Sequence, residues 1–176
     1  LERFPGTDRV YGKSIDNRIG CYIIYETLKR IKQSGKKPKY TIIAQFSTQE
    51  EIGTRGAIVG TYAKDPNVAL VFDVGHSIDI PGSSKQDDGE TVMGKGPEVS
   101  VGPNLNPKIT KFIIEVAKKS QIPIQINVEP SLTGTNARAT QMTKSGVPTA
   151  VLGPPLRYMH TQIETIDMND VELLIQ

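Results

Sequence analysis

The chain has 176 residues, enough for a single domain with one buried core. Hydrophobic residues make up 37% and charged residues 23%, a composition typical of an ordinary α/β protein and not of a disordered or fibrous one. Because Lys and Arg (21) nearly balance Asp and Glu (19), the net charge is too small to attract nucleic acid or an anionic membrane. We therefore expect neither as a partner.

The first half of the chain predicts an alternation of helices and strands. Hydrophobic residues recur with helical spacing over residues 14–32, and Gly and Pro residues follow. Residues 40–46 are β-branched and aromatic, which predicts a buried strand. A short helix over residues 56–62 and a strand over residues 68–72 complete this half.

The second half begins with a segment expected to form a surface loop, and helices and strands then alternate again. Residues 81–96 are rich in Gly, Ser, Asp and Lys, and we expect little packing there. The later elements are predicted from apolar spacing and from Pro and Gly signals: a helix over 107–120, a strand over 122–128, a helix over 136–144, a strand over 147–152 and a last helix from about Asn169.

This order predicts an α/β fold of three layers, with a mostly parallel central sheet and helices on both faces. In such sheets, ligands bind beyond the carboxyl ends of the strands. Glu50, Glu51, Asp73 and His160 each follow an apolar, strand-like run. The predicted fold therefore brings these four side chains toward one edge of the sheet.

Glu50 and Glu51 leave the predicted strand side by side. Adjacent carboxylates with reduced hydration repel each other, so one of them needs a cation or a proton nearby. A metal ion would meet this need, and the second carboxylate could then accept a proton from water activated by the ion. Taken alone, the pair is more typical of an exposed helix start, where the helix dipole favours negative charge.

The other candidate residues also have ordinary local interpretations. Asp73 could cap a turn, Asp16 could cap a helix, and His76 and His160 could each be simply packed or exposed. Their combination is more informative, because a dinuclear hydrolytic site needs a bridging carboxylate, terminal carboxylate or imidazole ligands, and a free carboxylate as base. The sequence can supply nearly that set.

At these residues the sequence resembles the tetrahedral aminopeptidases, the glutamyl or deblocking type of dinuclear metallopeptidase, some of which are known as endoglucanases. The similarity lies in Gly12–Cys21, Gln49–Ala57, Val71–Val74 and Pro155–His160 with Glu164. The resemblance implies that Asp16 bridges two divalent metal ions, zinc or cobalt. It further implies that Glu50 is the general base and that Glu51, Asp73 and His160 are metal ligands.

The resemblance also implies features that lie outside these motifs. It places Arg157 and Asn136 near the substrate, although many family members carry Asp where this chain has Asn136. It implies a cis peptide bond after Asp16. The family has a further ligand histidine near its N-terminus and an inserted β-rich dimerisation domain, neither of which occurs here. We therefore expect residues 1–176 to be a catalytic domain that is incomplete at its N-terminus.

The function that these residues predict is removal of N-terminal residues from peptides, in a homo-oligomer that family resemblance makes a dodecamer. The alternatives are a metal-dependent deacylase, a glycoside hydrolase that uses the paired carboxylates, or a catalytically impaired assembly fragment. The single cysteine, Cys21, excludes an internal disulfide and favours a cytoplasmic location.

Overall fold

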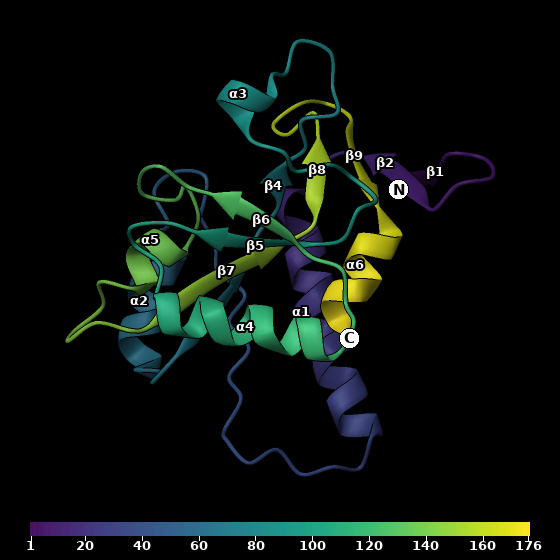
Figure 1. The fold of residues 1–176 in the computed structure, drawn as a ribbon. Coiled ribbons are helices and arrows are strands. Elements are labelled where there is room, and N and C mark those ends of the chain that lie inside the picture. Colours follow the sequence, from purple (N-terminus) through teal and green to yellow (C-terminus); the bar gives the residue numbers. More distant parts are fainter.

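The computed structural model describes the backbone of residues 1–176 and every side chain except that of Asp88. Its helices and strands form two sheets with helices packed around them (Figure 1). The helices are α1 (Ile15–Gln33), α2 (Arg55–Lys64), α3 (Lys85–Asp88), α4 (Pro107–Lys119), α5 (Ala137–Thr140) and α6 (Met168–Ile175). The strands are β1 (Glu2–Arg3), β2 (Arg9–Gly12), β3 (Ala69–Phe72), β4 (Gly75–His76), β5 (Glu98–Val101), β6 (Gln125–Val128), β7 (Thr149–Gly153), β8 (Pro155–Arg157) and β9 (Glu164–Asp167).

The four-stranded sheet has the order β3-β7-β5-β6. The β3–β7 and β5–β6 pairs are parallel, whereas β5 and β7 run antiparallel. Helices α4 and α5 pack against this sheet, and a small core of Leu105, Ala137 and Val151 lies between them. This sheet confirms the α/β class and its parallel strand pairs.

The five-stranded sheet, with the order β1-β2-β9-β8-β4, was not predicted. All its pairs are antiparallel except β4–β8. The largest hydrophobic cluster lies where α1 and α6 meet this sheet, and its fully buried members include Ile23, Leu156 and Ile166. The β2–β9 pair joins segments more than 150 residues apart, so no local pattern could have indicated it.

The structure has a helix at each predicted position, and most of these helices have nearly the predicted length. Asn106 caps α4, because its side-chain oxygen accepts hydrogen bonds from the N–H groups of Lys108 and Ile109, and Pro107 follows in the first turn. The helix expected over 136–144 is shorter, since α5 ends at Thr140. None of the described helices is long and apolar enough to cross a membrane.

The strand predicted over residues 40–46 is wrong. That segment carries no strand in the structure and pairs with no described strand. Its β-branched residues favour an extended backbone, but a strand also needs a neighbour to hydrogen-bond its N–H and C=O groups. The short helix α3 also lies within residues 81–96, where the sequence predicted a surface loop.

Candidate metal centre

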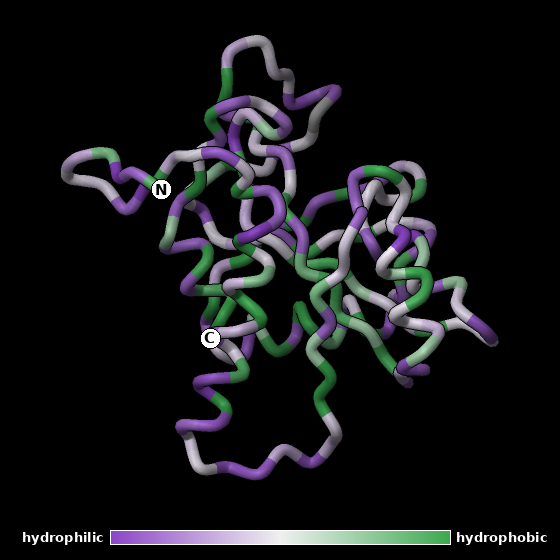
Figure 2. Tube along the Cα trace, turned by 180° about the vertical axis from the view of Figure 1, so that it is seen from behind, coloured by the Kyte–Doolittle hydropathy of each residue, from purple (hydrophilic) through white to green (hydrophobic). Residues whose placement is uncertain are grey.

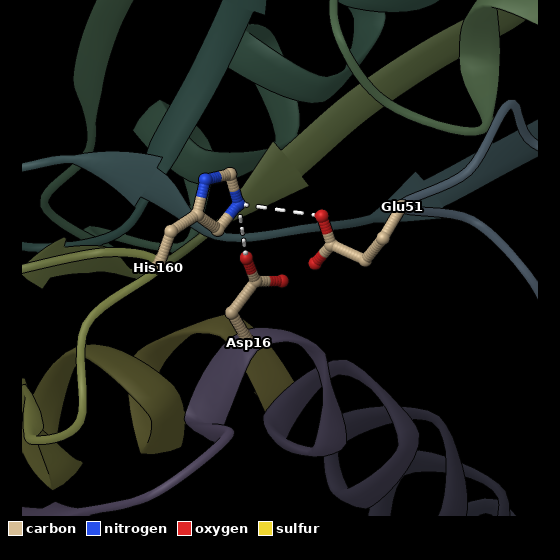
Figure 3. A group of neighbouring side chains, drawn as sticks. All are labelled: Asp16, Glu51 and His160. Atoms are coloured by element: carbon tan, nitrogen blue, oxygen red, sulfur yellow. Dashed lines mark ion pairs between the residues drawn. The ribbon is translucent and has the colours of Figure 1, made fainter.

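Three side chains from distant parts of the chain meet at one point (Figure 3). Asp16 comes from the first turn of α1, Glu51 from the loop before α2, and His160 from the turn between β8 and β9. The His160 Nε2 atom lies 3.1 Å from an oxygen of Asp16 and 3.4 Å from an oxygen of Glu51. One donor atom from each residue lies within 4.8 Å of the others, a spacing at which the three could bind one metal ion and form a candidate metal-ligand set.

Asn17 fixes Asp16 beside the end of β3. Its side-chain amide donates a hydrogen bond to the Phe72 carbonyl at 2.8 Å, and its amide oxygen accepts one from the Gly20 N–H at 2.9 Å. A Cβ on Gly20 would lie 2.4 Å from the Asn17 amide oxygen, so only glycine permits this close approach. The peptide bond between Asp16 and Asn17 is cis, as expected from the resemblance.

Glu164 joins the backbone segments that carry Asp16 and His160. One carboxylate oxygen accepts a hydrogen bond from the Asp16 N–H at 3.0 Å, and the other accepts one from the His160 N–H at 3.1 Å. The residue is only 2% exposed. Its carboxylate therefore sets the spacing between two of the candidate ligands, a role that its place in the sequence did not indicate.

The remaining two carboxylates lie beside this group. Asp73, directly after β3, is 8% exposed, and burial together with repulsion from Asp16 and Glu50 raises its pKa to about 7. Burial and repulsion from Glu51 and Asp16 also raise the pKa of Glu50. Burial, followed by repulsion from Glu51 and Glu164, raises the pKa of Asp16 to about 6. All three pKa values rise mainly because the carboxyl groups are buried, and repulsion between neighbouring carboxylates adds to the shifts.

The donor set suits a divalent cation. Carboxylate oxygens with one imidazole nitrogen are ligands for zinc and similar ions, and a cation would offset the mutual repulsion of the carboxylates. Asp16, Glu51 and His160 can bind one ion directly. Asp73 is outside this group of three, and a second ion between it and Asp16 would need further ligands. One buried oxygen of Glu50, Oε1, accepts no hydrogen bond from the described residues.

The other predicted residues lie in different surroundings. The Arg157 guanidinium pairs with the Asp79 carboxylate through two hydrogen bonds, one of them 3.0 Å long. The Asn136 amide oxygen is buried and accepts no hydrogen bond from a described residue. His76, in β4, is exposed and belongs to no group of metal-ligating side chains among those described.

A cleft of about 980 Å³ adjoins the metal-ligand set. Glu50 and Glu51 line it at one side, and α2 contributes Ile58, Val59 and Tyr62. These three α2 side chains are exposed, so the cleft has a hydrophobic wall that is open to solvent. Glu50 and Glu51 can therefore be reached from this cleft.

The chain is similar to aminopeptidases of known sequence and structure. The lysyl aminopeptidase of Pyrococcus furiosus is 42% identical over 164 residues, which cover 92% of this chain and 45% of the relative. The solved TET aminopeptidase of the marine sediment archaeon Thaumarchaeota archaeon SCGC AB-539-E09 superposes with a TM-score of 0.87 at 32% identity, covering 99% of this chain and 49% of that one.

A second solved structure, the TET1 peptidase of Pyrococcus horikoshii, has a TM-score of 0.71 at 26% identity and covers 95% of this chain and 48% of its own. That peptidase can assemble into a tetrahedron or a large octahedral shell. The chain thus spans about half the length of the relatives that it matches. The family model described as M42 glutamyl aminopeptidase matches residues 3–176, and the chain belongs to this family.

Proposed function

We propose that the protein is a metal-dependent aminopeptidase that removes N-terminal residues from peptides. The observation that carries this proposal is the meeting of Asp16, Glu51 and His160 within 4.8 Å, with Glu50 adjacent to Glu51. The 42% identity to a lysyl aminopeptidase supports the same activity. It does not fix which N-terminal residue is preferred.

Asp16, Glu51 and His160 would hold one divalent ion, and Asp16 with Asp73 would contribute to a second. Zinc and cobalt both suit this mixture of oxygen and nitrogen donors. A divalent ion at this position supplies Lewis-acid chemistry, because it lowers the pKa of water and stabilises negative charge on the scissile carbonyl oxygen. Glu164 keeps two of the ligands at the correct spacing.

Glu50 is the proposed general base. Its neighbour Glu51 points toward His160, whereas Glu50 is partly buried and lines the cleft in which a peptide would lie. Its carboxylate accepts a proton from the attacking water and passes it to the leaving amine. Hydrogen bonds from the Gly53 and Thr54 N–H groups to the Glu50 carbonyl hold the backbone from which this side chain extends.

Peptides are the proposed partners, together with other copies of the same chain. The hydrophobic wall of Ile58, Val59 and Tyr62 can contact the side chains of an extended peptide. Assembly of the Pyrococcus horikoshii relative into closed shells supports a homo-oligomer, with a dodecamer as the form expected from family resemblance. The cysteine Cys21 is a free thiol, which is consistent with a cytoplasmic location.

The test measures release of N-terminal residues from unblocked peptides by the complete natural polypeptide. It compares the Glu50→Gln variant with Glu115→Gln, a variant at a distant surface position. The account predicts that Glu50→Gln loses at least about 100-fold in kcat while zinc binding persists, and that a chelator abolishes activity. A glycosidase that depends only on carboxylates would retain activity in the chelator. Unchanged peptidase activity in Glu50→Gln would refute the assignment.

A further inference from the structure

The lining of the cleft beside Glu50 and Glu51 includes two basic side chains, Arg138 and Lys144. The Lys144 Nζ atom lies 3.0 Å from a carboxylate oxygen of Asp65, so its charge is already paired. Arg138 is exposed, and its guanidinium forms no ion pair or hydrogen bond with any residue whose side chain the structure describes. Its positive charge is therefore available to a ligand in the cleft.

The cleft runs along α2, away from the paired glutamates. Thr54, directly before α2, donates its N–H to the Glu50 carbonyl at 2.8 Å, so the helix begins beside the proposed base. Thr54, Ile58 and Tyr62 all line the cleft, at successive turns of the chain. With a rise of about 1.5 Å per residue, the cleft extends about 12 Å along the helix from Thr54 to Tyr62.

The segment that carries Arg138 lies beside α2 (Figure 1). The hydroxyl oxygens of Thr61 and Thr140 are 3.3 Å apart, which joins the end of α5 to the second half of α2. Farther along, the Lys144 Nζ atom lies 4.8 Å from the centre of the Tyr62 ring. Because Arg138 precedes these contacts in the chain and also lines the cleft, it lies between the paired glutamates and the far end of the cleft.

Hydrophobic and charged groups meet in this part of the molecule. In Figure 2, which shows the molecule from behind, the end that holds α2 and α5 lies at the right and carries hydrophilic stretches beside hydrophobic ones. The exposed side chains of Ile58 and Tyr62 form the hydrophobic wall, and Met142 in the same lining is 67% exposed. One available cation among such side chains suits an extended peptide that carries a single acidic group.

We propose that Arg138 is a specificity-determining residue that binds a carboxylate of the peptide substrate two or three residues beyond the scissile bond. This inference rests on the proposed aminopeptidase function, in which only the N-terminal residue precedes that bond. A cleft about 12 Å long therefore receives the residues that follow it. An extended peptide rises about 3.3 Å per residue, so its third or fourth residue reaches the level of Arg138. The carboxylate is an Asp or Glu side chain, or the C-terminus of a short peptide.

The test uses peptides that differ only in charge. Alanine hexapeptides with a C-terminal amide carry Asp or the uncharged Asn at one position, and release of the N-terminal Ala by the complete natural polypeptide gives kcat/KM. The proposal predicts that Asp exceeds Asn by about 5-fold at the third or fourth residue, less at other positions, and that added salt reduces the difference. Alanine tripeptides or tetrapeptides with a free C-terminus should show a similar gain over their amides.

Variants at Arg138 show whether this residue causes the preference. Arg138→Gln should remove the preference for Asp, and Arg138→Glu should reverse it, so that Lys exceeds Asp at the same position. Lys119→Gln, at an exposed position of α4, should keep the preference. An unchanged preference in Arg138→Gln, or a preference for acidic residues only at the N-terminal position, would overturn the proposal.

Binding measurements separate this proposal from the proposed catalytic function. Calorimetry gives the affinity of the Asp and Asn peptides for Glu50→Gln, in which the proposed base is absent, and for Glu50→Gln combined with Arg138→Gln. The proposal predicts tighter binding of the Asp peptide by the first protein and equal binding by the second. Failure to hydrolyse any peptide would contradict the aminopeptidase function alone, whereas equal binding of the two peptides by Glu50→Gln would overturn the role of Arg138.

Discussion

Gly153, the last residue of β7, lies directly against the backbone of Asp73. A Cβ added to Gly153 would sit 1.4 Å from the Asp73 carbonyl oxygen and 2.6 Å from its carbonyl carbon. The contact brings the end of β3 close to the end of β7, and with it the Asp73 side chain close to Asp16 and Glu50. The position of one candidate ligand thus depends on the absence of a side chain on a neighbouring strand.

Gly153→Ala should destabilise the fold strongly, because neither backbone can move without breaking the β3–β7 pairing. We expect a loss of about 3 kcal/mol or more in the free energy of unfolding. Gly134→Ala is the matched control, since a Cβ there meets nothing within 4 Å. Urea denaturation of both variants measures the difference, and equal stabilities would contradict the close contact.

Metal binding should stabilise the protein. Zinc at 100 times its dissociation constant should raise the free energy of unfolding by about 2.7 kcal/mol, and a chelator should reverse the effect. Asp16→Asn removes a candidate ligand and should abolish most of this gain, whereas Asp8→Asn, at an exposed site, should keep it. Thermal unfolding with and without zinc provides the measurement. An equal zinc response in Asp16→Asn and the unmodified protein would argue against Asp16 as a ligand.

Glu164→Gln should weaken metal binding without removing a ligand. An amide has only one oxygen, so the variant cannot accept hydrogen bonds from both the Asp16 and the His160 N–H groups through two oxygens. Residues that orient metal ligands typically contribute about 10- to 100-fold to affinity, and we expect a loss in that range. Calorimetric titration with zinc tests this. An unchanged affinity in a folded variant would show that Glu164 does not position the ligands.

The buried Glu98 predicts a pH dependence of stability. It is 2% exposed, and burial, followed by repulsion from Glu129 and Asp170, raises its pKa to about 8. The unfolded chain ionises this group near its ordinary value of 4.5, so the folded state holds an extra proton at intermediate pH. The free energy of unfolding should therefore fall as the pH rises from about 5 to about 8, by about 1.4 kcal/mol per unit from this group.

Glu98→Gln should flatten that dependence, because the amide has no proton to lose. Denaturation of the variant and the unmodified protein across the same pH range isolates the contribution of Glu98, since Asp16 and Asp73 titrate in both. Parallel stability curves for the two proteins would mean that Glu98 does not hold a proton in the folded state.

The sequence predicted those parts of the structure that local patterns determine. Helical spacing indicated α1, α2 and α4, and the apolar runs indicated β3 and β7, each followed by candidate site residues. The apolar runs predicted that Glu50, Glu51, Asp73 and His160 lie near one edge of the sheet, whereas the place of Asp16 beside Glu51 and His160 was implied only by the family resemblance. Residue types and the rule that ligands gather beyond the strand ends suggested a metal site, and the family resemblance supplied the role of each residue.

The parts that the sequence did not predict depend on distant neighbours. Strand β5 begins with the charged Glu98, a residue type that is depleted in strands, and only burial between other elements explains it. The five-stranded sheet joins the two ends of the chain. Residues 40–46 show the opposite error, because strand propensity without a pairing partner did not produce a strand.

The most direct test of the metal centre is anomalous diffraction from crystals of the protein grown with zinc or cobalt. The account predicts an anomalous peak about 2.0 to 2.2 Å from oxygens of Asp16 and Glu51 and from the Nε2 atom of His160. A metal bound elsewhere, or these three side chains in contact with one another without any metal between them, would contradict it.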